Sequence, residues 1–151
     1  MFKTYYSSEI GIVEIVSSED AIISLDFVDK EGETTEFPPI LREAYDQIDE
    51  YFKGKRKNFD LKLSIEGTEF QKKVWTELTK IPYGEVATYK DIAIRVGNEK
   101  AVRAVGNSNN KNKIAIILPC HRVIGSNGKL VGYAGGVHIK EWLLNHERKF
   151  K

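Results

Sequence analysis

The sequence predicts an α/β protein of the α+β type with two parts: a sheet-and-helix domain at residues 1–66 and a helical domain at residues 67–151. Three observations support this. Apolar residues alternate early in the chain, they recur at helical spacing later, and the charge changes sign between the halves. Residues 1–65 carry 8 Lys and Arg against 14 Asp and Glu, a net −6, and residues 66–151 carry 15 against 8, a net +7.

The first domain begins with strand-like alternation and continues with one helix. Residues 23–27 read ISLDF, and Gly11 and the polar cluster at 17–20 mark turns, so we expect a small antiparallel sheet. Apolar residues then recur every three or four positions across 41–52, and Gly54 can end that helix. One amphipathic helix should therefore pack on the sheet.

The second domain begins after a short alternating run at 61–65, and we place the boundary near Gly67. Thr68 and Gln71 have the spacing of a capping box, and the residues that follow carry an apolar helical face. This pattern predicts that a helix opens the domain.

The next segment has the form of a helix-turn-helix. Thr88 can cap a helix that runs to Val96, Gly97 can turn the chain, and residues 101–105 begin a second helix. In such motifs the second helix usually lies against DNA. The pattern alone leaves open the plainer interpretation that two short helices simply pack together.

Length and composition describe an ordinary globular protein. The chain has 151 residues, and its single cysteine permits no internal disulfide. The first six residues do not resemble a signal peptide, and no apolar run approaches the roughly 20 residues that span a bilayer. We expect a soluble, intracellular protein. The basic second half favours a polyanion partner, although solvated surface charge would look the same.

The best candidate for chemistry is Cys120, within the run PCHRVI at 119–124. A thiol becomes a good nucleophile when a base or a positive field removes its proton, and His121 and Arg122 follow directly. The competing interpretation is a buried cysteine that acts as a small hydrophobic residue.

Several motifs, in order and at consistent spacing, resemble the O6-alkylguanine-DNA alkyltransferases, also called methylated-DNA–protein-cysteine methyltransferases. The resemblance covers roughly residues 68–148, and the first 65 residues match only in general layout. Its motifs are IPYGEVATY at 81–89, AVRAVGN at 101–107, PCHRVI at 119–124, GYAGG at 132–136 and KEWLLNHE at 140–147.

The resemblance implies a winged-helix-like C-terminal domain and a single chemical event at Cys120. The alkyl group of the damaged base moves to this cysteine, and the resulting thioether is not hydrolysed. By the same resemblance, His121 removes the thiol proton through a water molecule and Glu147 orients His121. Without the resemblance, Glu147 could equally cap or solvate the last helix.

Reaching O6 requires the nucleotide to be rotated out of the stack. In this family an arginine fills the vacated place and a tyrosine turns the nucleotide and donates to the purine, and Arg103 and Tyr89 occupy those positions. The second helix enters the minor groove, and we expect Ala104, Gly106 and Arg122 to contact DNA. From the residues alone, Arg103 could be an ordinary phosphate-binding residue and Tyr89 a core aromatic.

The resemblance also assigns a pocket and a structural link. Asn112 should tie the recognition helix to the active-site strand. The family often has a serine where this chain has Ala134, so we expect a weaker contact to O6, by about 1 kcal/mol. The expected pocket residues are Tyr133, Ala134, Gly135 and Val123.

The sequence therefore predicts a suicide DNA repair protein that acts on O6-alkylguanine and O4-alkylthymine in double-stranded DNA. We expect no cofactor, no metal, no membrane association, a monomer, and a cytoplasmic location beside the nucleoid in a prokaryote. No cysteine is present in residues 1–65 to build the zinc site of some relatives. Two alternatives remain: a non-catalytic helix-turn-helix protein that recognises alkylated DNA, and a cysteine hydrolase.

Overall fold

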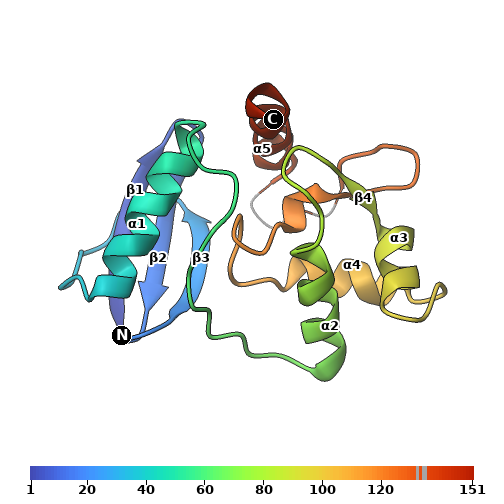
Figure 1. Cartoon of the computed structure of the whole chain (residues 1–151), viewed down its shortest axis with the longest axis horizontal. Helices are drawn as coiled ribbons and strands as arrows, with labels where there is room; N and C mark the ends of the chain where they lie inside the picture. The colour runs from blue at the N-terminus through green and yellow to red at the C-terminus, as the bar shows by residue number, and fades with distance from the viewer. Residues whose placement is uncertain (132, 134–135) are drawn as a thin grey trace. The chain divides into compact units, whose positions relative to one another are not determined.

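The structure, a computed structural model, describes residues 1–131, 133 and 136–151. The chain divides into two compact units, Met1–Ile65 and Glu66–Lys151. The first unit contains a sheet and one helix, and the second is mainly helical (Figure 1). This architecture confirms the predicted mixed α/β fold class.

The first unit is built on a three-stranded antiparallel sheet. Its strands are β1 (Phe2–Ser8), β2 (Gly11–Ser17) and β3 (Ile22–Val28), in that spatial order. Helix α1 (Pro39–Phe52) lies across one face of the sheet (Figure 1). The short connections between the strands explain the simple meander, because antiparallel neighbours need only tight turns.

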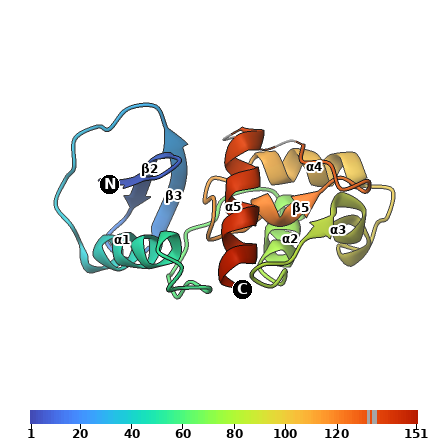
Figure 2. The ribbon, with the colours of Figure 1, turned by 90° about the horizontal axis from the view of Figure 1, so that it is seen from above.

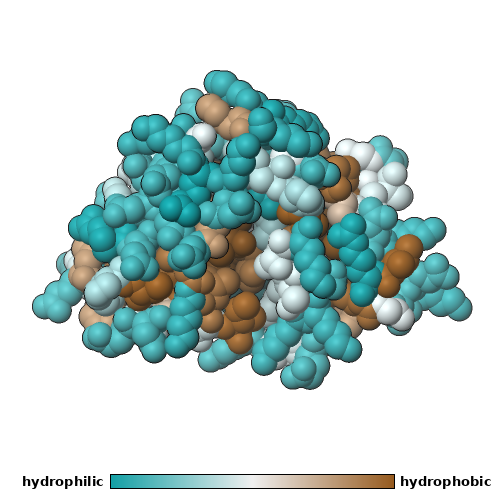
Figure 3. All heavy atoms as spheres, viewed as in Figure 1, coloured by the Kyte–Doolittle hydropathy of each residue, from teal (hydrophilic) through white to brown (hydrophobic). Residues whose placement is uncertain are grey.

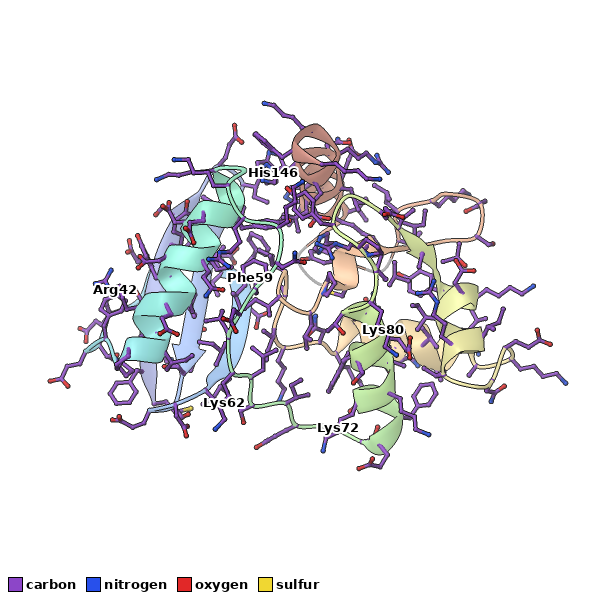
Figure 4. All side chains as sticks on the ribbon, viewed as in Figure 1. Arg42, Phe59, Lys62, Lys72, Lys80 and His146 are labelled. Carbon is purple, nitrogen blue, oxygen red and sulfur yellow. The ribbon has the colours of Figure 1, made fainter. Side chains whose placement is uncertain are left out.

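Helix α1 packs through the apolar stripe that the sequence predicts. Leu41, Ala44 and Ile48 are completely buried and lie on one helical face. Tyr51 is also buried, and its ring lies 5.6 Å from that of Phe59, which follows the helix in the chain (Figure 4). These contacts give the unit a core of its own.

One local expectation differs from the structure, and one alternating run forms little regular structure. In β3 the most buried residues are Ile22 and Leu25, because a register shift at Val16 and Ser17 displaces the alternation expected over 23–27. The alternating run at 61–65 forms a single parallel bridge, between Leu63 and Ile22, and no strand.

The regular structure described in the second unit is mainly helical and includes α2 (Glu69–Leu78), α3 (Tyr89–Arg95), α4 (Val102–Asn110) and α5 (Val137–Phe150) (Figure 2). Helix α2 packs against α3 and α4, and the pair α3–α4 forms the predicted helix-turn-helix.

Capping explains where two of these helices begin. Thr68 accepts from the backbone N–H of Gln71, whose side chain accepts in return, so the predicted capping box at α2 is confirmed. Thr88 and Asp91 form the same arrangement at α3. Both helix starts are therefore fixed by local side chains.

Apolar residues fill the centre of the second unit, while the face of the molecule seen in Figure 3 is largely hydrophilic. Val74, Leu78, Ile92, Val105 and Leu143 are completely buried. No helix within the described residues is long and apolar enough to cross a bilayer.

Candidate active site

Cys120 lies in a short 3₁₀ turn, η1 (Cys120–Arg122), and its side chain is buried. The turn leads directly into β5 (Val123–Ile124), which pairs in parallel with β4 (Ala87–Thr88). Because β4 ends where α3 begins, this pairing places the cysteine turn beside the start of the helix-turn-helix.

Two very tight turns shape the chain just before the cysteine. The N–H of Ile117 donates to the carbonyl of Ala115 at 2.7 Å, with Ile116 between them at φ 69°. The N–H of Cys120 donates to the carbonyl of Leu118, also at 2.7 Å. Both bonds close γ-turns, and a positive φ at a β-branched residue is strained. These two hydrogen bonds fix the backbone conformation of the residues that lead into Cys120.

Two asparagines connect this segment to α4 and to the chain just after it: Asn109 lies in α4, and Asn112 lies two residues beyond its end. The side-chain amide of Asn109 donates to the carbonyl of Cys120 at 3.2 Å. Asn112 donates to the carbonyl of Leu118 at 2.8 Å and accepts from the N–H of Ile114 at 2.9 Å. All these bonds are buried, so the helix and the cysteine turn are coupled through hydrogen bonds that water does not replace.

His121 and Glu147 form a fully buried pair. Nε2 of His121 lies 2.6 Å from Oε2 of Glu147, and neither side chain is exposed. Burial lowers the pKa of His121, and the charges of Arg122 and Lys140 add to this effect, which exceeds the opposite effect of Glu147. The imidazole is therefore neutral near pH 7.

The hydrogen-bond network also assigns the tautomer of His121. An ionised carboxylate can only accept, so Nε2 carries the ring proton and donates it to Glu147. The other ring nitrogen, Nδ1, is buried and makes no hydrogen bond within the described part of the chain. It keeps a lone pair that can accept a proton.

Arg122 holds the same carboxylate from the other side. Its Nε donates to Oε1 of Glu147 at 2.8 Å, its Nη2 donates to Oε2 at 3.1 Å, and its Nη1 donates to the carbonyl of Ile81 at 2.8 Å. The N–H of Gly84 donates to Oε1 as well. Burial would raise the pKa of Glu147, but His121 and Arg122 hold it below its usual value.

Arg122 has a structural role inside the unit, and its contact with DNA stays a prediction. The residue is buried, and its guanidinium is directed to Glu147 and Ile81 inside the unit. Arg122 belongs to the support of the His121–Glu147 pair.

The expected DNA-contacting residues of α4 lie at its surface. Arg103 and Ala104 are exposed, and Gly106 is half-buried. A Cβ atom added at Gly106 would lie 4.0 Å from the ring of Tyr89, which is an ordinary van der Waals contact. Tyr89 begins α3, and its hydroxyl donates to the carbonyl of Val131 at 2.9 Å. Burial and the nearby Cys120 raise the pKa of Tyr89. The phenol thus remains protonated and able to donate.

The expected pocket residues are only partly described. Val123 is completely buried beside the cysteine turn, and Tyr133 is half-buried. Ala134 and Gly135 lie outside the described residues. The ring of His146, the residue before Glu147, stacks on the ring of Trp142, with ring centroids 4.8 Å apart; His146 is labelled in Figure 4.

Two residues near the cysteine were missed from the sequence. Asn109 gave no signal, because one asparagine among several polar neighbours looks like surface. Lys140 did give one: with Leu143, Leu144 and Glu147 it occupies a single helical face, and a charge on an otherwise apolar stripe indicates a buried, partnered group. Within the described residues no cluster of three or more His, Cys, Asp or Glu could hold a metal ion.

Comparison with known proteins gives matches across the whole chain. Residues 1–65 match the family described as "6-O-methylguanine DNA methyltransferase, ribonuclease-like domain", and residues 69–149 match "6-O-methylguanine DNA methyltransferase, DNA binding domain".

Similar proteins include methylated-DNA–protein-cysteine methyltransferases of Methanosarcina barkeri and Bacillus subtilis, the latter termed constitutive. Each is 50% identical to this chain; the alignments cover 97% of this chain and 97% and 95% of the relatives. The structure of the Mycobacterium tuberculosis protein OGT in complex with DNA matches with a TM-score of 0.91 and 40% identity, over 99% of this chain and 94% of that one.

Proposed function

Since this chain belongs to the 6-O-methylguanine DNA methyltransferase family, we propose that it repairs DNA by transferring the alkyl group from O6 of guanine to Sγ of its own Cys120. We extend the substrate range to O4-alkylthymine, whose alkyl group is bound to an equivalent exocyclic oxygen. The observation that carries this proposal is the buried pair formed by His121, which directly follows the cysteine, and Glu147 of α5.

The pair supports a specific order of proton movement. Nδ1 of His121 accepts the thiol proton through one water molecule, and Glu147 stabilises the imidazolium that forms. Because Arg122 already holds Glu147 ionised, the carboxylate keeps its charge and does not take the proton itself. The result is a thiolate at Cys120.

The transfer itself is a displacement at the alkyl carbon. The thiolate forms an S–C bond, the C–O6 bond breaks, and its electron pair moves to the guanine oxygen. The purine then takes up one proton, for which we propose the protonated Tyr89 hydroxyl as the donor, and the resulting phenolate regains a proton from solvent. The product is a thioether, which water does not cleave, so each molecule acts once.

DNA engagement is assigned to the helix-turn-helix. The target base must leave the stack, at a cost of a few kcal/mol. The exposed Arg103 on α4 has a planar, permanently charged side chain that can occupy the vacated place and stack on neighbouring bases. The net charge of +7 over residues 66–151 favours contacts with phosphates, which fit any sequence.

We also propose that the protein acts as a monomer on double-stranded DNA and works in the cytoplasm, where prokaryotic DNA lies. The reaction needs one thiol, one proton acceptor and one DNA lesion. The proposed thiol, Cys120, and the proposed proton acceptor, His121, come from a single chain. Neither a metal nor a cofactor has a part in the proposed chemistry.

The deciding experiment is incubation with a duplex that contains one O6-methylguanine, followed by intact-mass measurement and peptide mapping. We expect one methyl group on Cys120, an unmodified guanine in the duplex, and no second turnover. The Cys120→Ser variant serves as the control and should stay unmodified. Tight binding to the lesion without transfer would favour the non-catalytic recognition protein, and turnover on an ester substrate would favour a hydrolase.

A further inference from the structure

The connection between α2 and β4 surrounds the buried ion pair of Arg122 and Glu147. The carbonyl of Ile81 accepts from Nη1 of Arg122 at 2.8 Å, and the ring of Tyr83 lies 5.7 Å from the guanidinium carbon. The N–H of Gly84 donates to Oε1 of Glu147 at 3.2 Å. This short stretch of chain therefore contacts both partners of the ion pair, although none of its side chains takes part in the proposed chemistry.

The N–H of Gly84 is one of four donors on the same carboxylate. Oε2 of Glu147 lies within hydrogen-bond distance of Nε2 of His121 and Nη2 of Arg122. Oε1 accepts from Nε of Arg122 and from the N–H of Gly84. A carboxylate offers about four lone-pair sites, so these contacts hold both oxygens and oppose rotation of the group. Three of the donors belong to side chains, and Gly84 supplies the donor that is fixed to the backbone.

Gly84 is the third residue of a β-turn, which is closed by a 3.1 Å hydrogen bond from the N–H of Glu85 to the carbonyl of Pro82. The φ of Gly84 is 79°, and the φ of Tyr83, the second residue of the turn, is negative. This combination defines a type II turn. Compared with a type I turn, the peptide group between the second and third residues is rotated by roughly 150°.

The turn type therefore determines which side of this peptide group faces Glu147. In the type II turn the N–H faces the carboxylate. In a type I turn the carbonyl oxygen of Tyr83 would face it instead, and two negatively polarised groups would repel each other. Glycine adopts a positive φ without strain. A Cβ atom at this position would lie 2.9 Å from Cδ of Lys151, but that side chain is exposed and can move, so backbone conformation is the main requirement for glycine.

We propose that Gly84 is a positioning residue of the transfer site: its type II turn directs a backbone N–H to Glu147 and thereby fixes the carboxylate that orients His121. This inference rests on the proposed function of His121 as the base for Cys120. It extends the support of the His121–Glu147 pair from side chains to the backbone.

The first test changes the backbone preference at residue 84. Gly84→Val disfavours the type II turn, because β-branched residues rarely adopt a positive φ. Gly84→Asn is the conservative variant, because asparagine adopts this conformation more readily than other non-glycine residues. Gly128→Val is the matched control, because Gly128 is exposed, has φ 82° and would place an added Cβ more than 4 Å from any other atom.

The readout is the NMR signal of the proton on Nε2 of His121, recorded without DNA. A proton in a 2.6 Å hydrogen bond to a carboxylate resonates far downfield, so its position reports how Glu147 is placed. We expect this signal to move upfield in Gly84→Val and to stay in place in Gly84→Asn and Gly128→Val. Methyl transfer from an O6-methylguanine duplex should slow by about tenfold in Gly84→Val alone, with unchanged DNA affinity.

A second measurement leaves every side chain in place. Incorporation of glycolic acid at position 84 replaces the N–H of Gly84 by an ester oxygen and so removes the donor alone. The His121 signal should again move upfield, and transfer should slow by about tenfold. The same replacement at Gly128, whose N–H donates to the carbonyl of Gly125, should change neither.

An unchanged His121 signal in the ester at position 84 would overturn the proposal, even if Gly84→Val did not fold. Slower transfer with an unchanged signal would reduce Gly84 to a general structural role and overturn it as well. A shifted signal, in a protein whose wild type transfers no methyl group, would contradict the proposed function and leave the assignment of Gly84 standing.

Discussion

His121 and Glu147 lie 2.6 Å apart, Nε2 to Oε2, in a part of the molecule where neither side chain reaches solvent. The contact between His121 and Glu147 can support proton transfer because Arg122 also forms an ion pair with Glu147. A carboxylate shared in this way stays ionised, fixes the proton of His121 on Nε2 and leaves Nδ1 as the acceptor. The same arrangement makes Glu147 important for stability, and the two effects can be separated experimentally.

Glu147→Gln should slow methyl transfer and also destabilise the protein. The amide cannot stabilise an imidazolium by charge, and it leaves the guanidinium of Arg122 buried without its counter-ion, at a cost of about 3–5 kcal/mol. Transfer kinetics with an O6-methylguanine duplex and urea unfolding measure the two effects, and DNA affinity should change little. Glu141→Gln, on an exposed position of the same helix, is the control. Unchanged transfer kinetics would remove Glu147 from the mechanism.

Stability should fall as the pH is lowered from 7 to 4. The pKa of His121 is lowered in the folded protein, so below about 6.5 the unfolded chain binds a proton that the folded chain does not. The pKa of Glu147 is lowered as well, so its contribution is present above its ordinary value and is lost as the pH falls below it. Both groups therefore lower the free energy of unfolding as the pH falls.

Urea unfolding followed by tryptophan fluorescence tests this pH dependence. Both tryptophans, Trp75 and Trp142, lie in the second unit, so the signal reports the unit that contains the pair. The unfolding midpoint should move to lower urea at each step below pH 7. A flat profile between pH 7 and 4 would show that the pair is not buried in its ionised-carboxylate form in solution.

Ile116 offers a test of backbone strain before the cysteine. It has φ 69° and is almost completely buried, so Ile116→Ala loses packing but keeps the strain, whereas Ile116→Gly also relieves the strain. We expect the glycine variant to be more stable than the alanine variant by about 1 kcal/mol. Urea unfolding of the two variants gives the comparison. If alanine were the more stable, the γ-turn at this position would not persist in solution.

Local signals predicted much of the fold. The capping pair of Thr68 and Gln71 fixed the start of α2, and the apolar spacing over 41–52 identified the stripe that α1 buries. Such features depend on residues within one or two helical turns, which is the range over which sequence patterns carry structural information.

The interior of the site was harder to predict because it depends on long-range contacts. His121 and Arg122 are adjacent, yet both reach Glu147, which lies 26 residues after His121 and 25 after Arg122. The sequence does not reveal that η1 turns both side chains to the same carboxylate, so the ion pair between Arg122 and Glu147 was not predicted. The helical pattern marks Lys140 as a buried charge, but its partners Tyr89 and Val131 come from other segments and cannot be identified from the sequence.

Arg103→Ala should separate base flipping from chemistry. Arg103 is exposed on α4, away from the buried His121–Glu147 pair, so its loss should leave the reactive thiol intact. If it occupies the space of the rotated nucleotide, repair of duplex DNA should fall by tenfold or more, because part of the unstacking cost of a few kcal/mol is no longer offset. Reaction with free O6-alkylguanine requires no rotation and should change little. Kinetics with both substrates, and Lys100→Ala as an exposed control near the start of α4, provide the comparison. An equal loss on both substrates, or on neither, would exclude the proposed role of Arg103.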